Sequence, residues 1–263
     1  MRIKLVLASI AAFAVYTAAA ASSPDAQMDE AFRTAFGSSP NVVRQVVRPR
    51  QTGRIHVPSA PVTLSLRPSA LMRLGDGSYV LVVLEDDTLG AHVDPGAVAV
   101  AHLRHDHGQW TALKVWPELA WTGNDGHAAD AVSVERFGGR PLALLNSDYL
   151  GQGQHTVSDW IVDLGPRAPS LLGVIPIGGS LTEEDGGCDR CSHYDYKGHV
   201  KAGSSAGELL SVRYTGWTKL AGGPNRKSPF TRKVTFALRE GKFVATSPLS
   251  LPDWRLVDAP SPR

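Results

Sequence analysis

The chain has 263 residues, of which 43% are hydrophobic and 20% are charged, and this is the composition of a globular protein that can bury a sizeable core. Lys and Arg number 27 against 25 Asp and Glu, and removal of residues 1–21, which include Arg2 and Lys4, would leave 25 of each sign. This balance argues against nucleic acid as the main partner.

The N-terminal segment has the features of a sorting signal. MRIK is basic, the apolar run after it is shorter than a membrane span, and Ala19–Ala21 supplies the small residues that signal peptidase accepts. We therefore expect residues 1–21 to be a cleaved signal peptide and the mature protein to be periplasmic or secreted, with no membrane span after cleavage. An uncleaved N-terminal anchor is the alternative.

Residues 22–60 are expected to form a short helix followed by an arginine-rich arm. Ser23 can cap the helix, Pro24 suits its first turn, and Gly37 can end it. The helix carries an apolar stripe made of Met28, Ala31, Phe32, Ala35 and Phe36. A helix this short needs a partner surface, so we expect it to dock on the rest of the fold.

Charge is unevenly distributed along the chain. Between Ala31 and Gly75 there is no Asp or Glu, whereas acid collects at residues 85–87. The same stretch holds seven arginines, which are Arg33, Arg44, Arg48, Arg50, Arg54, Arg67 and Arg73. A second basic cluster consists of Arg226, Lys227, Arg232 and Lys233. We expect charge matching within the molecule. The alternatives are a basic surface for anionic glycans or lipid headgroups, and an arm that binds an envelope partner.

Residues 61–258 read as one all-β domain. ALMRL–GDGS–YVLVVLE has the pattern of a hairpin, and similar pairs of short strands follow it as far as the turn Glu240–Gly241. Because the helices needed for parallel crossovers are missing, the pattern favours an antiparallel meander. We expect a sandwich or a partly open barrel. A propeller-like arrangement of four-stranded units is the alternative.

Both cysteines lie in the segment DGGCDRCSHYDYKGHV. Cys188 and Cys191 have the spacing of a redox motif or of half a zinc site, to which His193 or His199 could contribute. The residues after Cys191 alternate like a strand rather than forming a helix, and export favours oxidised thiols. We therefore expect a Cys188–Cys191 disulfide that holds its loop locally.

The histidines of HLRHDHG are candidate metal ligands. The segment holds His102, His105 and His107, and its HxH pair would place two rings on one face of a strand, which together with a third ligand could hold zinc or copper. They also coincide with the expected tip of a hairpin, where polar residues are ordinary. We favour the hairpin and expect neither a metal nor another cofactor.

Recognised nucleophile motifs are missing, so no catalytic residue can be assigned, and aromatic residues give the best candidate site. Two segments, 148–160 and 192–196, combine aromatic and polar residues. They supply the candidate ligand-binding residues Tyr149, Gln152, Trp160, His193, Tyr194 and Tyr196. Packing in the core or in loops is the favoured interpretation of these aromatic residues, and an exposed aromatic surface suited to sugars is the alternative.

The stretch AVSVERFGGRPLALLNSDYLGQGQHTVSDWIVDLG, followed by a Cys-containing loop and YDYKGHV, resembles exported bacterial β-rich proteins of unassigned function. The resemblance covers residues 130–203 and implies an extracytoplasmic location and an all-β fold, without catalytic residues. We expect a binding or structural role in the cell envelope, with a glycan or another envelope component as partner. The alternative is a small hydrolase or lyase acting on envelope or extracellular polymers.

Overall fold

The structure is a computed structural model that describes residues 23–48, 51–52, 55–56, 60–90, 94–151, 154–181, 192–203, 210–220, 226–246 and 251. The expected signal peptide and the two cysteines lie outside the described residues. Within the described ranges, no helix has the length and apolar character needed to cross a membrane.

One helix, α1 (Pro24–Phe36), precedes the strands. The first sheet consists of β1 (Val43–Arg48), β4 (Ala60–Arg73), β5 (Tyr79–Asp87), β6 (Gly96–Asp106) and β7 (Gln109–Thr122). The second sheet consists of β8 (Ala131–Phe137), β9 (Arg140–Gly151), β10 (Gln154–Asp163), β11 (Ser170–Leu181), β12 (His193–Ala202), β13 (Leu210–Lys219), β14 (Ser228–Arg239) and β15 (Lys242–Ala245). A short pair, β2 (Gln51–Thr52) and β3 (Ile55–His56), stands apart from both sheets.

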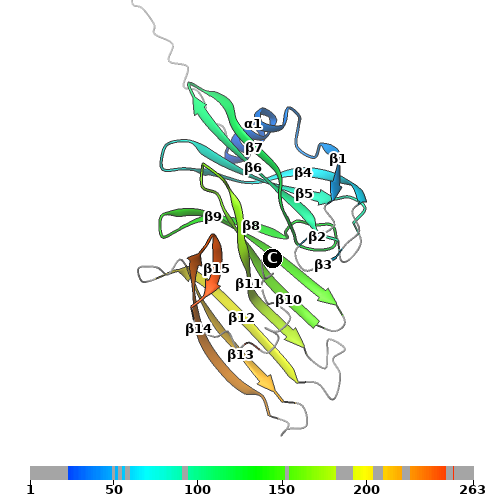
Figure 1. The fold of residues 1–263 in the computed structure, drawn as a ribbon, viewed down its shortest axis with the longest axis vertical. Coiled ribbons are helices and arrows are strands. Elements are labelled where there is room, and N and C mark those ends of the chain that lie inside the picture. The colour runs from blue at the N-terminus through cyan, green and yellow to red at the C-terminus, as the bar shows by residue number, and fades with distance from the viewer. Residues whose placement is uncertain are drawn as a thin grey trace, which may run out of the picture.

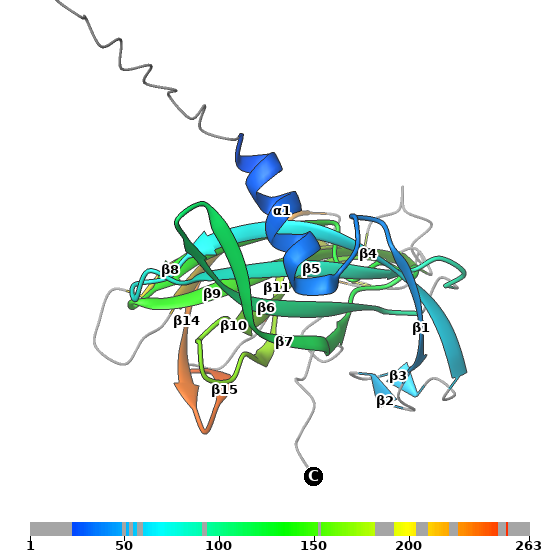
Figure 2. The ribbon, with the colours of Figure 1, turned by 90° about the horizontal axis from the view of Figure 1, so that it is seen from above.

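Both sheets are antiparallel, and from β4 onward their strands are ordered as in the chain, so the expected meander is confirmed (Figure 1). The first sheet curls into half a barrel, as the view from above shows (Figure 2). Tight turns join the expected hairpins, for example between β4 and β5, between β8 and β9, and between β14 and β15. The all-β fold and its sandwich or partly open barrel form are therefore confirmed.

The local signals for α1 also act as expected. The Ser23 hydroxyl accepts a hydrogen bond from the Ala26 N–H at 3.2 Å. Gly37 is left-handed, with φ of 69°, and donates its N–H to the Arg33 carbonyl at 2.9 Å. Phe32 is fully buried, and α1 contacts β4–β7 (Figure 2). The helix therefore docks on the first sheet through its apolar stripe.

The first sheet is covered on both faces, which explains the nearly unbroken apolar sequences of β5 and β6. On β6, Ala97, Ala99 and Ala101 face the core beneath α1, while Val98 and Val100 face the second sheet. Small residues on the helix side let α1 approach the strand closely. The other face packs against β9 and β10 of the second sheet in a shared core.

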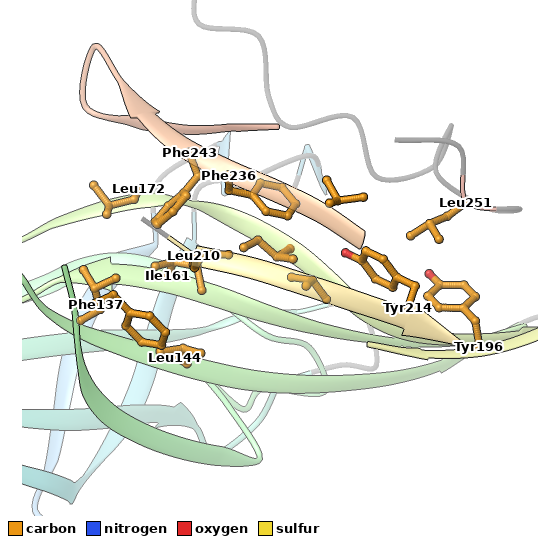
Figure 3. Close-up of a cluster of buried hydrophobic side chains, with 14 of the residues drawn as sticks. Phe137, Leu144, Ile161, Leu172, Tyr196, Leu210, Tyr214, Phe236, Phe243 and Leu251 are labelled. Atoms are coloured by element: carbon orange, nitrogen blue, oxygen red, sulfur yellow. The ribbon is translucent and has the colours of Figure 1, made fainter. Parts of the chain in front are cut away.

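The second sheet curls so that it encloses the face that points away from the first sheet. β9 contributes Leu145 to the core shared with the first sheet and Leu144 to a separate core enclosed by β11–β15. Contacts between β11 and β15 close this curl. Figure 3 shows Phe243 towards one end of the enclosed core and Tyr196 and Leu251 at the other. The layers are therefore α1, the first sheet, β8–β10, and the curled strands β12–β15.

Candidate functional site

The acidic sequence Glu85-Asp86-Asp87 at the end of β5 meets three arginines. Arg44 pairs with Glu85, Arg48 with Asp87 at 3.8 Å, and Arg67 with Asp86 at 3.4 Å. β4 lies between β1 and β5, so Arg44 and Arg48 reach across an intervening strand. Charge matching within the molecule is confirmed for Arg44, Arg48 and Arg67, whereas Arg50 and Arg54 lie outside the described residues.

Glu85 is the most deeply buried member of this charged group, with a fully buried side chain. Arg44 contacts both Glu85 and Glu118, the latter at 2.6 Å. Glu118 lies at a bulge of β7 with a positive φ of 41°, and its backbone N–H donates to Glu85 Oε2 at 3.2 Å. The Glu85 pKa is raised to about 7, chiefly by burial and also by the Glu118 charge, against the lowering effect of Arg44.

The three candidate metal-binding histidines point to different surroundings. His102 is buried between the sheets, where its Nε2 lies 3.3 Å from the Leu164 carbonyl, and burial lowers its pKa. His105 packs on Trp110 with ring centroids 4.5 Å apart, and His107 lies in the hairpin turn. Among the described residues there is no group of three or more His, Cys, Asp or Glu side chains placed to hold a metal.

The described aromatic candidates do not lie together on one exposed surface. His193, Tyr194 and Tyr196 are buried, with Tyr196 only 1% exposed. Tyr194 and Tyr196 face the enclosed core, whereas Trp160 packs on the opposite face of the second sheet, in the core shared with the first. Tyr149 is half-buried on β9, and Gln152 lies outside the described residues. Ligand binding by these residues stays a prediction.

Packing explains the burial of the tyrosines. Tyr196 stands opposite Gly216, and Tyr214 stands opposite Gly198, so each ring lies beside a residue without a side chain. The Tyr196 and Tyr214 rings meet edge to face with centroids 6.0 Å apart. The Tyr214 hydroxyl donates to the Pro176 carbonyl at 2.9 Å, and Tyr194 accepts from Gln154 at 2.8 Å. These contacts account for the aromatic residues as core.

The face of β12–β14 opposite this core is strongly basic. Residues 192–246 contain ten Lys and Arg against three Asp and Glu, although the whole chain is nearly balanced. Because strand residues alternate between faces, most basic residues of β12–β14, although not Arg232, lie opposite the tyrosines and valines of the core. Five exposed residues define what we call the outer basic face: Lys197, His199, Lys201, Arg213 and Lys233.

The register brings like charges together on the outer basic face. Arg213 stands directly opposite Lys233 on β14, and its partner on β12 is His199. Within the described part of the chain, none of these side chains forms an ion pair. Like charges directly opposite each other on neighbouring strands destabilise a sheet. The outer basic face therefore differs from the first sheet, where arginines are matched by acids.

A pocket of about 360 Å³ opens at the end of β12, β13 and β14. Its described lining is Ser192, His193, Thr218, Leu220, Ser228, Pro229, Phe230, Arg232 and Leu251. His193 is 4% exposed, and its Nδ1 atom has no hydrogen-bond partner among the described residues. A buried polar atom without a partner costs about 1–3 kcal/mol. His193 is thus a sequence candidate that lines this pocket.

No family model, curated protein or solved structure matches this chain. From the sequence we identified only the basic residues of segment 226–233 and missed the rest of the outer basic face. The signal was present in the alternation of HYDYKGHVKA, which sets Lys197, His199 and Lys201 on the face opposite the tyrosines.

Proposed function

We propose that this protein is exported and binds an acidic polysaccharide of the cell envelope or its surroundings through the outer basic face. The observation that supports this proposal is the outer basic face itself, whose five residues form no ion pair within the described part of the chain and lie at the end of the molecule away from α1 (Figure 1). A surface with one sign of charge raises the local concentration of ligands of opposite charge.

The size and chemistry of the face suit a polymer. Lys197 and Lys201 are about 14 Å apart along β12, and β12 and β14 are about 10 Å apart across the sheet. The outer basic face can therefore contact several charges of one polysaccharide molecule. Exposed hydroxyls of Thr215 and Thr231 lie beside the cations and can donate to carboxylate oxygens. Repeated weak contacts of this kind favour a polyanion over a single small ion.

A lipid surface fits this face less well than a polysaccharide. Proteins that lie on membranes insert large apolar side chains beside their cations. On β12–β14 the described part of the outer basic face carries no exposed large aliphatic residue. Trp217 is half-buried there, with the Lys227 ammonium 4.0 Å from its ring centroid. The partner is therefore a soluble or matrix-bound acidic glycan.

The hydrolase or lyase alternative needs a cleft that gathers acid and base groups. The described lining of the pocket combines one imidazole with hydroxyl groups and an arginine, and no carboxylate is among those lining residues. This combination supplies hydrogen-bond donors and apolar contacts. It supports a binding role more than a hydrolytic one.

The test is binding of fluorescent polygalacturonate to the mature protein, with neutral dextran as the uncharged comparison. We expect the affinity for polygalacturonate to fall as salt is raised, because surface charges are screened. The double variant Arg213→Ser with Lys233→Ser should bind about 10- to 30-fold more weakly, since each cation near an anionic surface contributes about 1 kcal/mol.

The matched control removes two exposed cations from the first sheet, Arg104→Ser with Lys114→Ser. It should bind polygalacturonate like the wild type. Equal losses in both double variants, or affinity that does not depend on salt, would overturn the proposal. Tighter binding to vesicles containing anionic lipid, or to duplex DNA, than to polygalacturonate at the same salt would replace the glycan by that partner.

Export and the cysteine state are tested by the intact mass of protein recovered from the producing cell. Cleavage after Ala21 should give a mass that begins at Ser22. A Cys188–Cys191 disulfide should add the mass of two hydrogens on reduction. A full-length mass would contradict the cleaved signal peptide, and a mass unchanged by reductant would contradict the disulfide.

A further inference from the structure

The pocket at the ends of β12–β14 is lined by cationic, hydroxyl and apolar groups, and several of them lie on the core side of the sheet. Thr218, Ser228 and Arg232 lie on the face that also carries Tyr214 and Val234, opposite the outer basic face. Thr218 and Ser228 are direct partners across β13 and β14, which places their hydroxyls side by side. These three residues therefore lie on the face opposite the five residues of the outer basic face, whereas His193 and Pro229, which also line the pocket, are in register with the outer side.

The lining combines one charged side chain with apolar side chains. Arg232 provides the positive charge, with its guanidinium carbon 5.9 Å from the Phe230 ring centroid. Phe230, Leu220 and Leu251 provide apolar walls, and Leu251 is itself part of the enclosed core (Figure 3). Gly216 stands opposite Phe230 on β13 and adds no side chain beside the ring. The pocket is thus an opening onto the apolar core with a cation at its rim.

His193, the first residue of β12, lies at the edge of the pocket. It is 4% exposed, and its Nδ1 atom lacks a hydrogen-bond partner among the described residues. The register pairs His193 with Lys219, in the row of the outer basic face, whereas Thr218, Ser228 and Arg232 lie on the core side of the sheet. The ligand is therefore assigned to Arg232, Thr218 and Ser228 and not to His193.

We propose that this pocket binds a small organic acid with an apolar body. The carboxylate pairs with Arg232, whose guanidinium matches it through two parallel hydrogen bonds, and the neighbouring hydroxyls of Thr218 and Ser228 donate to it. The apolar body packs on Phe230, Leu220 and Leu251. A volume of 360 Å³ corresponds to about a dozen water molecules, so the ligand is a medium-chain acid rather than a lipid with two chains.

The experiment titrates the mature protein with decanoate by calorimetry and compares decanol and gluconate. Decanol keeps the apolar body and loses the charge, and gluconate keeps the charge and loses the apolar body. We expect saturable binding of one decanoate, and at least tenfold weaker binding of the other two. No binding of decanoate, or equal binding of decanol or gluconate, would overturn the proposal.

Adjacent residues on β14 supply matched variants. Arg232→Gln should weaken decanoate binding at least tenfold and leave polygalacturonate binding near the wild-type value. Lys233→Gln, whose side chain lies on the outer basic face, should weaken polygalacturonate binding and leave decanoate unaffected. The two variants therefore test the pocket proposal and the polysaccharide proposal separately. Equal decanoate affinity in both variants would show that the ligand does not use Arg232.

A third variant tests the proposal even if Arg232→Gln does not fold. Leu220 is largely exposed at the rim of the pocket, so Leu220→Glu should leave the fold intact. Its carboxylate should repel decanoate and reduce the affinity about tenfold, while decanol binding changes less. A folded Leu220→Glu protein that binds decanoate as the wild type does would overturn the placement of the ligand.

Discussion

Glu85 is a carboxyl group whose ionisation opposes folding at neutral pH. Its pKa is about 7 in the folded protein, chiefly because it is buried, and 4.5 is its ordinary value. The folded state therefore holds a proton that the unfolded state has lost between these two values. The stability that Glu85 contributes is complete below pH 4.5 and is lost as the pH rises through 7, with a total of about 3 kcal/mol.

The variant Glu85→Gln should remove this dependence because it cannot ionise. The free energy of unfolding in urea, measured at several pH values from 5 to 8, should fall less steeply with pH than in the wild type. Glu135→Gln, on the exposed strand β8, is the control and should keep the wild-type slope. A Glu85→Gln protein with the full wild-type slope would mean that another group carries the pH dependence.

Gly216 sets the spacing of β12 and β13 where Tyr196 packs. A Cβ atom at Gly216 would lie 2.6 Å from the Tyr196 Cβ and would also collide with the Asp195 carbonyl oxygen. Because backbone cannot move aside as a side chain can, Gly216→Ala should lower the free energy of unfolding by about 1–3 kcal/mol. Gly75→Ala, where no atom lies within 4 Å, should change it by less than about 1 kcal/mol in denaturant titrations. Equal effects of the two changes would contradict this account.

At the level of elements, β1 is held to the first sheet by buried charge as well as by its ladder with β4. The Arg48 side chain is 7% exposed and lies 2.8 Å from Asp94 and 3.8 Å from Asp87. Arg67 also pairs with an aspartate, but its side chain is 47% exposed. The two pairs therefore test the same chemistry in different solvent environments.

Arg48→Ala should lower the free energy of unfolding by about 3–5 kcal/mol, because it leaves carboxylates buried without their guanidinium. Arg67→Ala should lower it by no more than about 1 kcal/mol. Hydrogen exchange should also show earlier loss of protection in β1 than in β5 for the Arg48 variant. Similar stabilities for the two variants would indicate that solvent reaches Asp87 and Asp94 readily.

Elements that depend on neighbouring residues could be predicted from the sequence. Ser23, Pro24 and Gly37 act within one turn of α1, and Asp76 and Gly77 form the turn between β4 and β5. The sequence alone could not decide whether Tyr194 and Tyr196 are buried or exposed. An alternating strand has two faces, and only the curl of the second sheet decides which of them is covered. The outer basic face and the pocket could not be predicted for a related reason, because each of them forms only when three strands pair in register.

At the scale of the whole molecule, the two sheets share one core. Leu145 on β9 and Val82 on β5 are both fully buried in it, together with residues of β6 and β10. Neither sheet can bury this face without the other. We therefore expect both sheets to unfold together, with α1 and β1 included, because α1 covers the other face of the first sheet. The expected boundary at residue 60, between the segment with the helix and the arm and the all-β domain, stays a prediction.

Leu145→Ala tests this shared core. Truncation of a fully buried leucine should lower the free energy of unfolding by about 2–5 kcal/mol. Native-state hydrogen exchange should then accelerate equally in peptides from β5–β6 and from β9–β10, although the substitution is confined to the second sheet. Leu113→Ala, at an exposed position of β7, should change neither group by more than about 0.5 kcal/mol. Faster exchange in β9–β10 alone would show that the first sheet is stable without its partner, because a cooperative unit loses protection throughout when its common core is weakened.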